Sequence, residues 1–320
     1  MIKKKTYYLQ RMSFIQKVIT MEIIKLNGVK IEKDSICAIG FFDGVHSAHK
    51  QLINKTIEIG NQMGLKKGVI TFDVHPKSVL FDLDYKYLTP LNKKIEVLKE
   101  FDLDYLYVIE FSKEKASLSP EDFINFYLGG IHTIVCGFDF KFGVRGSGNV
   151  ETLKASHNFN TVVVKEVTFD GFKVGSTHIR DLINSGQVEN VIDVLGDYYS
   201  IKGEVIHGAK KGRMIGYPTA NVDTTNYLIP KKGVYTTLTK VDGVWYKSMS
   251  SIGHNPTLNC MVNVSVESHI FDFNQDIYGK TIEVKFVKRL RNEEKFASIE
   301  DLVKKIDEDK VHSLEILKNI

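Results

Sequence analysis

The chain has 320 residues, of which 43% are hydrophobic and 26% are charged, a composition typical of a globular protein long enough for two domains. No window offers the roughly 18 consecutive apolar residues that a membrane helix needs, which argues against a membrane protein. The formal net charge of +4 arises in residues 1–20, which carry five basic residues and no acid, so the remainder gives no case for nucleic-acid binding.

Residues 1–20 have neither a clean apolar core nor a small-residue cleavage site, so they make a poor secretion signal. Met21 is a natural start, and we expect the preceding residues to be an upstream-start extension or a disordered leader. Cys37, Cys136 and Cys260 are isolated and odd in number, which predicts neither a disulfide framework nor a metal site and favours the cytoplasm.

The first half alternates short apolar runs with helical patterns. Helices are predicted from Ser47, over 93–101 and after Ser119, which is an N-cap followed by proline and two acids. This alternation predicts an α/β domain with a mainly parallel sheet covered by helices on both faces. The predicted strands are 36–39, 69–72, 105–109, 133–136 and 161–164.

A glycine turn, residues 40–49, joins the first predicted strand to the helix that starts near Ser47. Its sequence is Gly40-Phe41-Phe42-Asp43-Gly44-Val45-His46-Ser47-Ala48-His49. Free N–H groups and the positive end of the helix dipole at such a turn suit a phosphate. His46 and His49 lie three residues apart, so both imidazoles can donate hydrogen bonds to it. The alternative is a glycine hairpin with two surface histidines.

Three further polar clusters follow predicted strands, so we expect them to converge on the same sheet edge. They are Asp73-Val74-His75-Pro76, the segment 137–143 and Ser176-Thr177-His178-Ile179-Arg180. In the last, Ser176 is expected to cap a helix and Arg180 to clamp a phosphate. Ordinary loop residues, an aromatic turn and a solvated arginine are the alternatives.

From Tyr199 the pattern changes to short strands separated by glycine-rich or asparagine-rich turns, which predicts a small antiparallel barrel. A final helix is predicted over 298–317. The predicted strands are 200–207, 233–241, 244–253, 262–273 and 281–287.

A second candidate site lies in this half, where Gly203, Gly208, Gly212 and Gly216 allow a loop to approach phosphates closely. Thr219 and Asn221 place two neutral oxygens on one side of an extended segment, which suits Mg²⁺ beside nucleotide phosphates. A turn that satisfies its own polar groups is the alternative.

Alternation over 264–271 places Glu267 and His269 on one face of a strand. A glutamate inside a small barrel is a candidate general base. A surface glutamate is the alternative.

With these motifs, the chain resembles the bacterial bifunctional riboflavin kinase/FAD synthetase family from Met21 to about Asp309. The run 40–49 is similar to the family's nucleotidyltransferase histidine motif, and 175–180 to its second motif. Gly216-Tyr217-Pro218-Thr219-Ala220-Asn221 is similar to the kinase signature, and further matching segments are 137–143, 252–257, 267–269 and 289–291. The departures from the family pattern are Ala48, Val74, Asn149 and Gly175.

The resemblance implies a nucleotidyltransferase domain over 21–185 and a riboflavin kinase barrel over 186–320. The kinase would convert riboflavin and ATP into FMN, and the first half would transfer AMP from ATP to FMN, giving FAD and pyrophosphate. It implies catalytic roles for Glu267, His46, His49 and Arg180, and a Mg²⁺ site at Thr219 and Asn221. Nucleotide-binding roles fall to Gly40, Phe42, Asp43, Gly44, Ser176, Thr177, Gly208, Gly212, Arg213, Gly216 and Pro218, and flavin-binding roles to Asp73, His75, Pro76, Asp139, Phe140, Phe142 and Arg291.

The expected partners are small molecules alone, with no membrane or nucleic acid, and the expected assembly is a monomer or weak homo-oligomer. Three alternatives stay open. The departures at Asn149 and Gly175 leave room for an enzyme with one impaired half. A flavin sensor would not need Glu267 as a base, and another nucleotidyltransferase would leave the second half without a purpose.

Overall fold

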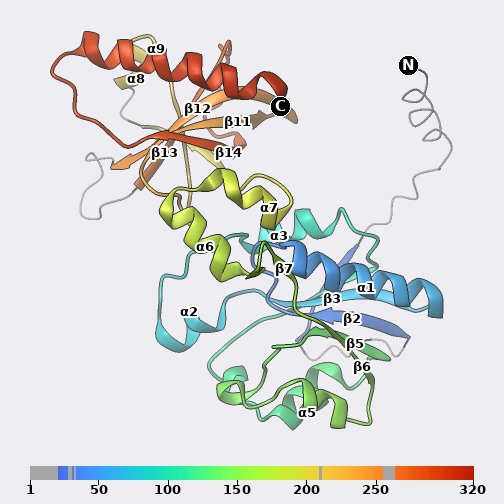
Figure 1. Cartoon of the computed structure of the whole chain (residues 1–320). Coiled ribbons are helices and arrows are strands. Elements are labelled where there is room, and N and C mark those ends of the chain that lie inside the picture. The colour runs from blue at the N-terminus through green and yellow to red at the C-terminus, as the bar shows by residue number, and fades with distance from the viewer. Residues whose placement is uncertain (1–20, 28–30, 32–33, 209–210, 255–263) are drawn as a thin grey trace, which may run out of the picture.

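The computed structural model describes residues 21–27, 31, 34–208, 211–254 and 264–320. The predicted leader, residues 1–20, and the segment 255–257 of one kinase motif lie outside these ranges. Figure 1 shows a helix-covered sheet, a separate barrel, and helices α6 and α7 between them.

The amino-terminal domain is built on a six-stranded sheet in the order β1-β4-β3-β2-β5-β6, in which every recorded pair is parallel. This confirms the predicted parallel sheet. The edge strand β1 was not predicted. The strands are β1 (Glu22–Lys25), β2 (Ser35–Ile39), β3 (Lys66–Phe72), β4 (Tyr105–Ile109), β5 (Thr133–Gly137) and β6 (Asn160–Val164).

Both faces of this sheet are buried. Along β2, Cys37 and Ile39 pack into one hydrophobic cluster and Ala38 into another on the opposite face. The covering helices are α1 (Ser47–Met63), α2 (Pro76–Phe81), α3 (Leu91–Leu98), α4 (Pro120–Phe123), which continues as a π-helical turn (Ile124–Leu128), and α5 (Val150–Ala155).

The helix signals in the sequence were largely correct. Ser119 caps α4, because its hydroxyl accepts the N–H of Asp122. Helix α3 begins and ends earlier than predicted, and Phe101 falls in the turn that follows it.

The carboxyl-terminal domain is a closed antiparallel barrel in the order β10-β13-β12-β11-β14-β9, which confirms the predicted barrel. Strand β10 was not predicted. The strands are β9 (Ser200–Ile206), β10 (Ala220–Val222), β11 (Gly233–Val241), β12 (Val244–His254), β13 (Val264–Ile270) and β14 (Thr281–Arg291). Helix α8 (Lys211–Met214) precedes β10, and α9 (Ile299–Ile316) begins after its N-cap Ser298.

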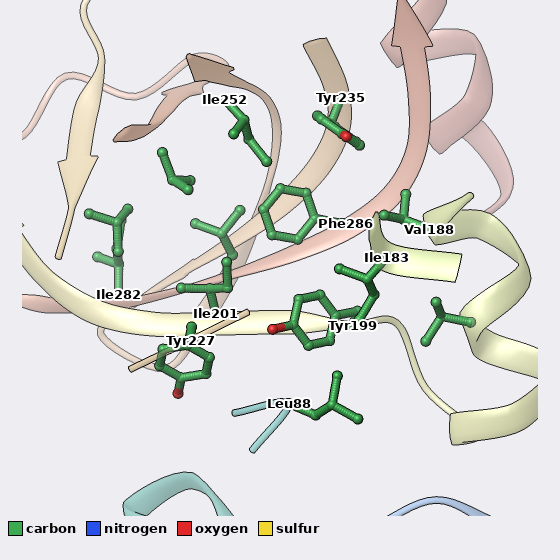
Figure 2. Packing of buried hydrophobic residues seen from close by; sticks show 14 of the residues in the cluster. Leu88, Ile183, Val188, Tyr199, Ile201, Tyr227, Tyr235, Ile252, Ile282 and Phe286 are labelled. Atoms are coloured by element: carbon green, nitrogen blue, oxygen red, sulfur yellow. The ribbon is translucent and has the colours of Figure 1, made fainter. Parts of the chain in front are cut away.

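A short hairpin, β7 (Thr168–Phe169) and β8 (Phe172–Lys173), precedes the connecting helices α6 (Ser176–Ser185) and α7 (Val191–Leu195). Residues of α6 and α7 share one hydrophobic cluster with the barrel, as Figure 2 shows for Ile183, Tyr199 and Phe286. Leu88 of the amino-terminal domain joins the same cluster. The apolar packing therefore crosses the predicted boundary at residues 185/186, and that boundary stays a prediction.

Candidate active sites

A cavity of about 610 Å³ lies at the carboxyl edge of the parallel sheet. Its lining includes the last residue of five neighbouring strands, namely Ile39, Phe72, Ile109, Gly137 and Val164. Open parallel sheets bind their ligands at this edge. Of the residues predicted for this half, the cavity brings together Gly40, Phe42, His46, His49, His75, Pro76, Asp139, Phe140, Phe142, Ser176 and Thr177.

The glycine turn forms one wall of this cavity, and its backbone is unusual. Phe42, Gly44 and Val45 all have positive φ, at 56°, 94° and 45°. Between Phe41 and Ala48, no backbone N–H donates to another group within the described part of the chain. A row of free donors at the start of α1 is the arrangement that binds a phosphate.

The two histidines stack on each other beside these donors, with ring centroids 3.6 Å apart. Nδ1 of His46 accepts the backbone N–H of His49, so the proton of a neutral His46 ring lies on Nε2. Burial lowers the pKa of His46 to about 4 and that of His49 well below its usual range. Both rings are therefore neutral near pH 7 and offer hydrogen bonds rather than positive charge.

Asp43 belongs to the turn, but neither it nor Arg180 lines the cavity. The guanidinium of Arg180 contacts a carboxylate oxygen of Asp43 at 2.5 Å, the carbonyl of Lys86 at 2.8 Å and the hydroxyl of Tyr85 at 2.7 Å. Burial raises the pKa of Asp43, and Arg180 opposes this in part. The phosphate-clamp role of Arg180 stays a prediction, while its visible contacts hold the turn.

Ser176 does not cap α6 as expected, because the N-cap is Gly175 and no side chain caps the helix. Its hydroxyl donates instead to the carbonyl of Asp43 at 2.8 Å. Gly44 faces the domain interface, where an added Cβ would lie 3.2 Å from a methyl group of Leu88.

The cluster around Asp73 divides into two parts. One carboxylate oxygen of Asp73 accepts the N–H groups of Val74 and Phe111, so it joins the ends of β3 and β4 and does not line the cavity. His75 does line the cavity and stacks on Tyr85 with centroids 4.0 Å apart. Burial lowers the pKa of His75 to about 4. The flavin-binding role of Asp73 stays a prediction.

Across the cavity, the segment 137–143 supplies an aromatic wall in which Phe140 and Phe142 stack with centroids 5.7 Å apart. Asp139 pairs with Lys173 at 2.6 Å. The sequence did not reveal that the cavity would be rich in cations, because these are scattered along the chain. Its basic side chains are Lys115, Lys141, Arg145, Lys165 and Lys173, against the acids Asp139 and Glu166.

The second site lies on the outer face of the barrel, between β10 and β13. The hydroxyl of Thr219 donates to Oε2 of Glu267 at 3.1 Å, and Asn221 stands opposite Glu267 in the strand pair. Glu267 is not inside the barrel, because the alternate residues Val266 and Ile270 fill the core. Of the two placements of Glu267 that the sequence left open, the structure shows the one outside the barrel, and its neighbours are those predicted.

Two hollows of about 440 and 400 Å³ adjoin this face and share Pro218 in their linings. Arg213 and Thr219 line the larger and Gly216 the smaller. The backbone of Gly208 packs so closely on Asn221 that an added Cβ would lie 2.2 Å from the amide nitrogen.

Two predicted residues of the second half serve other contacts. A Cβ on Gly212 would lie 2.2 Å from the carbonyl oxygen of Tyr217, so this glycine permits a tight turn. Arg291 forms an ion pair with the buried Asp309 at 2.8 Å, joining β14 to α9, and its flavin-binding role stays a prediction.

Comparisons with known proteins match both halves of the chain. The family model described as FAD synthetase matches residues 29–178, and that described as riboflavin kinase matches 195–317. A Listeria monocytogenes protein named bifunctional riboflavin kinase/FMN adenylyltransferase is 39% identical over 86% of this chain and 90% of its own length. The chain belongs to the bifunctional riboflavin kinase/FMN adenylyltransferase family.

Further members of this family show the same coverage. The Bacillus subtilis relative of that name is 39% identical over 89% of this chain and 93% of its own, and the Escherichia coli K12 relative is 32% identical over the same shares. A solved structure described as a macrolide-efflux protein from Streptococcus pneumoniae has a TM-score of 0.83 at 31% identity, over 94% of this chain and 100% of that one.

No helix in the described ranges has both the length and the apolar character needed to cross a membrane.

The departures from the family pattern are accommodated without strain. Gly175 is extended, and no heavy atom lies within 4 Å of the position of an added Cβ. Asn149 caps α5 and forms a capping box with Thr152. The adenylyltransferase half therefore keeps its cavity and turn despite these changes.

A magnesium ion is implied by kinase chemistry, and the kinase half has a donor set that fits it. Thr219, Asn221 and Glu267 bring hydroxyl, amide and carboxylate oxygens together. Mg²⁺ prefers such hard oxygens and keeps ligands from water and phosphate. The described ranges hold no cluster of three or more His, Cys, Asp or Glu side chains able to bind a metal.

Proposed function

We propose that the chain performs two consecutive ATP-dependent reactions at the two sites described above. The barrel site phosphorylates the 5′-hydroxyl of riboflavin, giving FMN and ADP. The sheet-edge cavity then transfers AMP from a second ATP to FMN, giving FAD and pyrophosphate. The observation that carries this proposal is the separation of the two polar clusters on different domains, each with groups suited to one reaction.

In the kinase reaction, the attacking hydroxyl is a poor nucleophile, so a base helps. Glu267 is the proposed base, and the Thr219 hydroxyl that donates to it fixes the orientation of the carboxylate. Thr219 and Asn221 would hold Mg²⁺, which when bound neutralises phosphate charge. The close packing of Gly208 keeps the Asn221 amide in place.

In the adenylyl transfer, the phosphate of FMN is already anionic and needs no base. One of its oxygens bonds to the α-phosphorus of ATP as the bond from that phosphorus to the bridging oxygen of the pyrophosphate breaks. Catalysis then depends on positioning and on stabilising charge. The free N–H groups of the turn and the neutral imidazoles of His46 and His49 supply donors, and the lysines of the cavity supply positive charge.

A product time course with riboflavin, ATP and Mg²⁺ tests this division. Glu267→Gln should slow FMN formation by about 10²–10⁴-fold, the usual contribution of a general base, and leave the conversion of supplied FMN to FAD intact. His49→Asn should let FMN accumulate. Matched controls are Glu204→Gln and His157→Asn, at exposed positions. Loss of both activities in a folded Glu267→Gln protein would contradict two independent sites.

A further inference from the structure

Lys94 is a buried lysine of α3 that belongs to none of the sequence motifs described above. It lies directly behind the glycine turn, residues 40–49. Its side chain is only 1% exposed. The ammonium donates to the carbonyl of Phe41 at 2.6 Å and to the hydroxyl of Thr71 at 3.2 Å, and it lies 4.2 Å from the centroid of the Phe41 ring. No carboxylate of the described residues lies within ion-pair distance of it, and the charges of Asp43 and Asp73 act on the ammonium from farther away.

An ammonium buried in this way is costly, so its position calls for a reason. Burial lowers the pKa of Lys94 to about 8, which leaves most of the side chain charged at neutral pH. On α3 it shares a face with Leu91 and Leu98, where an apolar residue would fit the pattern. Packing alone therefore does not account for a lysine here.

The contacts of the Phe41 carbonyl supply the reason. This oxygen accepts from both Lys94 and Thr71, two side chains in the protein interior. In a trans peptide the C=O and the following N–H point in opposite directions. The N–H of Phe42 therefore points away from these donors, and it has no acceptor within the described chain; Phe42 itself lines the cavity.

The conformation that results is not one that Phe42 would adopt by preference, because its φ of 56° lies in the left-handed region. A charged donor on the preceding carbonyl offsets this cost and fixes the plane of the peptide. We propose that Lys94 is a positioning residue for adenylyl transfer: by holding the Phe41 carbonyl, it aims the Phe42 N–H at a phosphate of ATP. This inference rests on the proposed function of the cavity.

Kinetics of Lys94→Met test the assignment. The expected result is a rise of about tenfold or more in the KM for ATP in FAD formation, the effect of losing one charge-assisted interaction. Riboflavin phosphorylation in the same protein should be unchanged. The melting temperature should be unchanged or higher, because an apolar side chain replaces a buried charge.

Two further variants separate positioning from general destabilisation. Leu98→Ala removes a buried apolar side chain of the same helix that forms no hydrogen bond to the turn, and should lower the melting temperature while the KM for ATP in FAD formation stays constant. Thr71→Val removes the second donor to the carbonyl and should raise that KM by about two- to threefold. It carries the test should Lys94→Met not fold.

The inference is overturned if Lys94→Met makes FAD with an unchanged KM for ATP, or if Leu98→Ala raises that KM equally. It is also overturned if both reactions of Lys94→Met fall in parallel with its stability. Failure of the wild-type protein to convert FMN to FAD is a different result, because it would remove the proposed function itself.

Discussion

The ion pair between Arg180 and Asp43 gives a prediction that separates structural support from direct phosphate binding. Asp43 is 3% exposed and Arg180 20%, and the guanidinium makes three hydrogen bonds there. Arg180→Met leaves the N–H of Thr89 as the remaining hydrogen-bond donor to the buried carboxylate among the described residues, so the free energy of unfolding should fall by about 3–5 kcal/mol. Asp43→Asn keeps one side-chain oxygen, which can accept from only one of the two donors, Arg180 and Thr89, and should cost less, about 1–3 kcal/mol.

Arg180→Met, Asp43→Asn and the double variant form a double-mutant cycle. We expect their unfolding free energies to show a coupling energy of about 2 kcal/mol or more, as for residues in one hydrogen-bond network. Urea unfolding followed by circular dichroism measures it. The fluorescence of Trp245, the single tryptophan of the chain, reports separately on the barrel, in which it lies on β12.

The rate of FAD formation in the same proteins then distinguishes the two roles of Arg180. If Arg180 acts by holding Asp43, the double variant should form FAD no more slowly than the slower of the two single variants. If it binds a phosphate directly, Arg180→Met should be much slower than Asp43→Asn. Additive changes in stability, with no coupling, would refute the view that the pair supports the turn.

Two other predictions concern the kinase site and the response to acid. Gly208→Ala should displace the Asn221 amide and raise the Mg²⁺ concentration needed for riboflavin phosphorylation by about 10–100-fold, with FAD formation from FMN as the unaffected control. His46, with its pKa lowered to about 4, stays neutral when folded and is protonated first in the unfolded chain. Stability should therefore fall by up to about 3 kcal/mol as the pH drops from about 6.5 to 4, and His46→Asn should flatten this decline; an identical decline in both proteins would contradict it.

The repeating patterns of the sequence predicted the sheet and the barrel because periodicity reports burial directly. Strand β10 was missed since it has three residues and depends on partners in β9 and β13 that are remote along the chain. The position of Glu267 stayed open in the sequence for a different reason. The barrel interior contains a hydroxyl network, including Ser268 and Thr239, so the interior face of β13 is not purely apolar. Alternation showed which residues share a face but not which face is inside.

The contacts that support the turn could not be predicted from the sequence either, because each joins segments that are far apart along the chain. Arg180 reaches Asp43 across 137 positions, and Lys94 reaches Phe41 across 53. One signal for Lys94 was present, since it stands on the apolar face of a helical pattern with Leu91 and Leu98. A charge at a core position of an amphipathic helix indicates a buried polar contact even when its partner is unknown.

The residues that support the glycine turn all belong to segments packed against the barrel. Arg180 lies on α6, whose apolar residues are part of the barrel cluster. The N–H of Thr89 binds Asp43, and its neighbour Leu88 is buried in that same cluster. Lys93, adjacent to Lys94 on α3, pairs with Glu283 of the barrel, where both side chains are largely buried. The glycine turn is therefore held in shape from the barrel side, so we expect substitutions at the domain interface to alter FAD formation without touching the cavity.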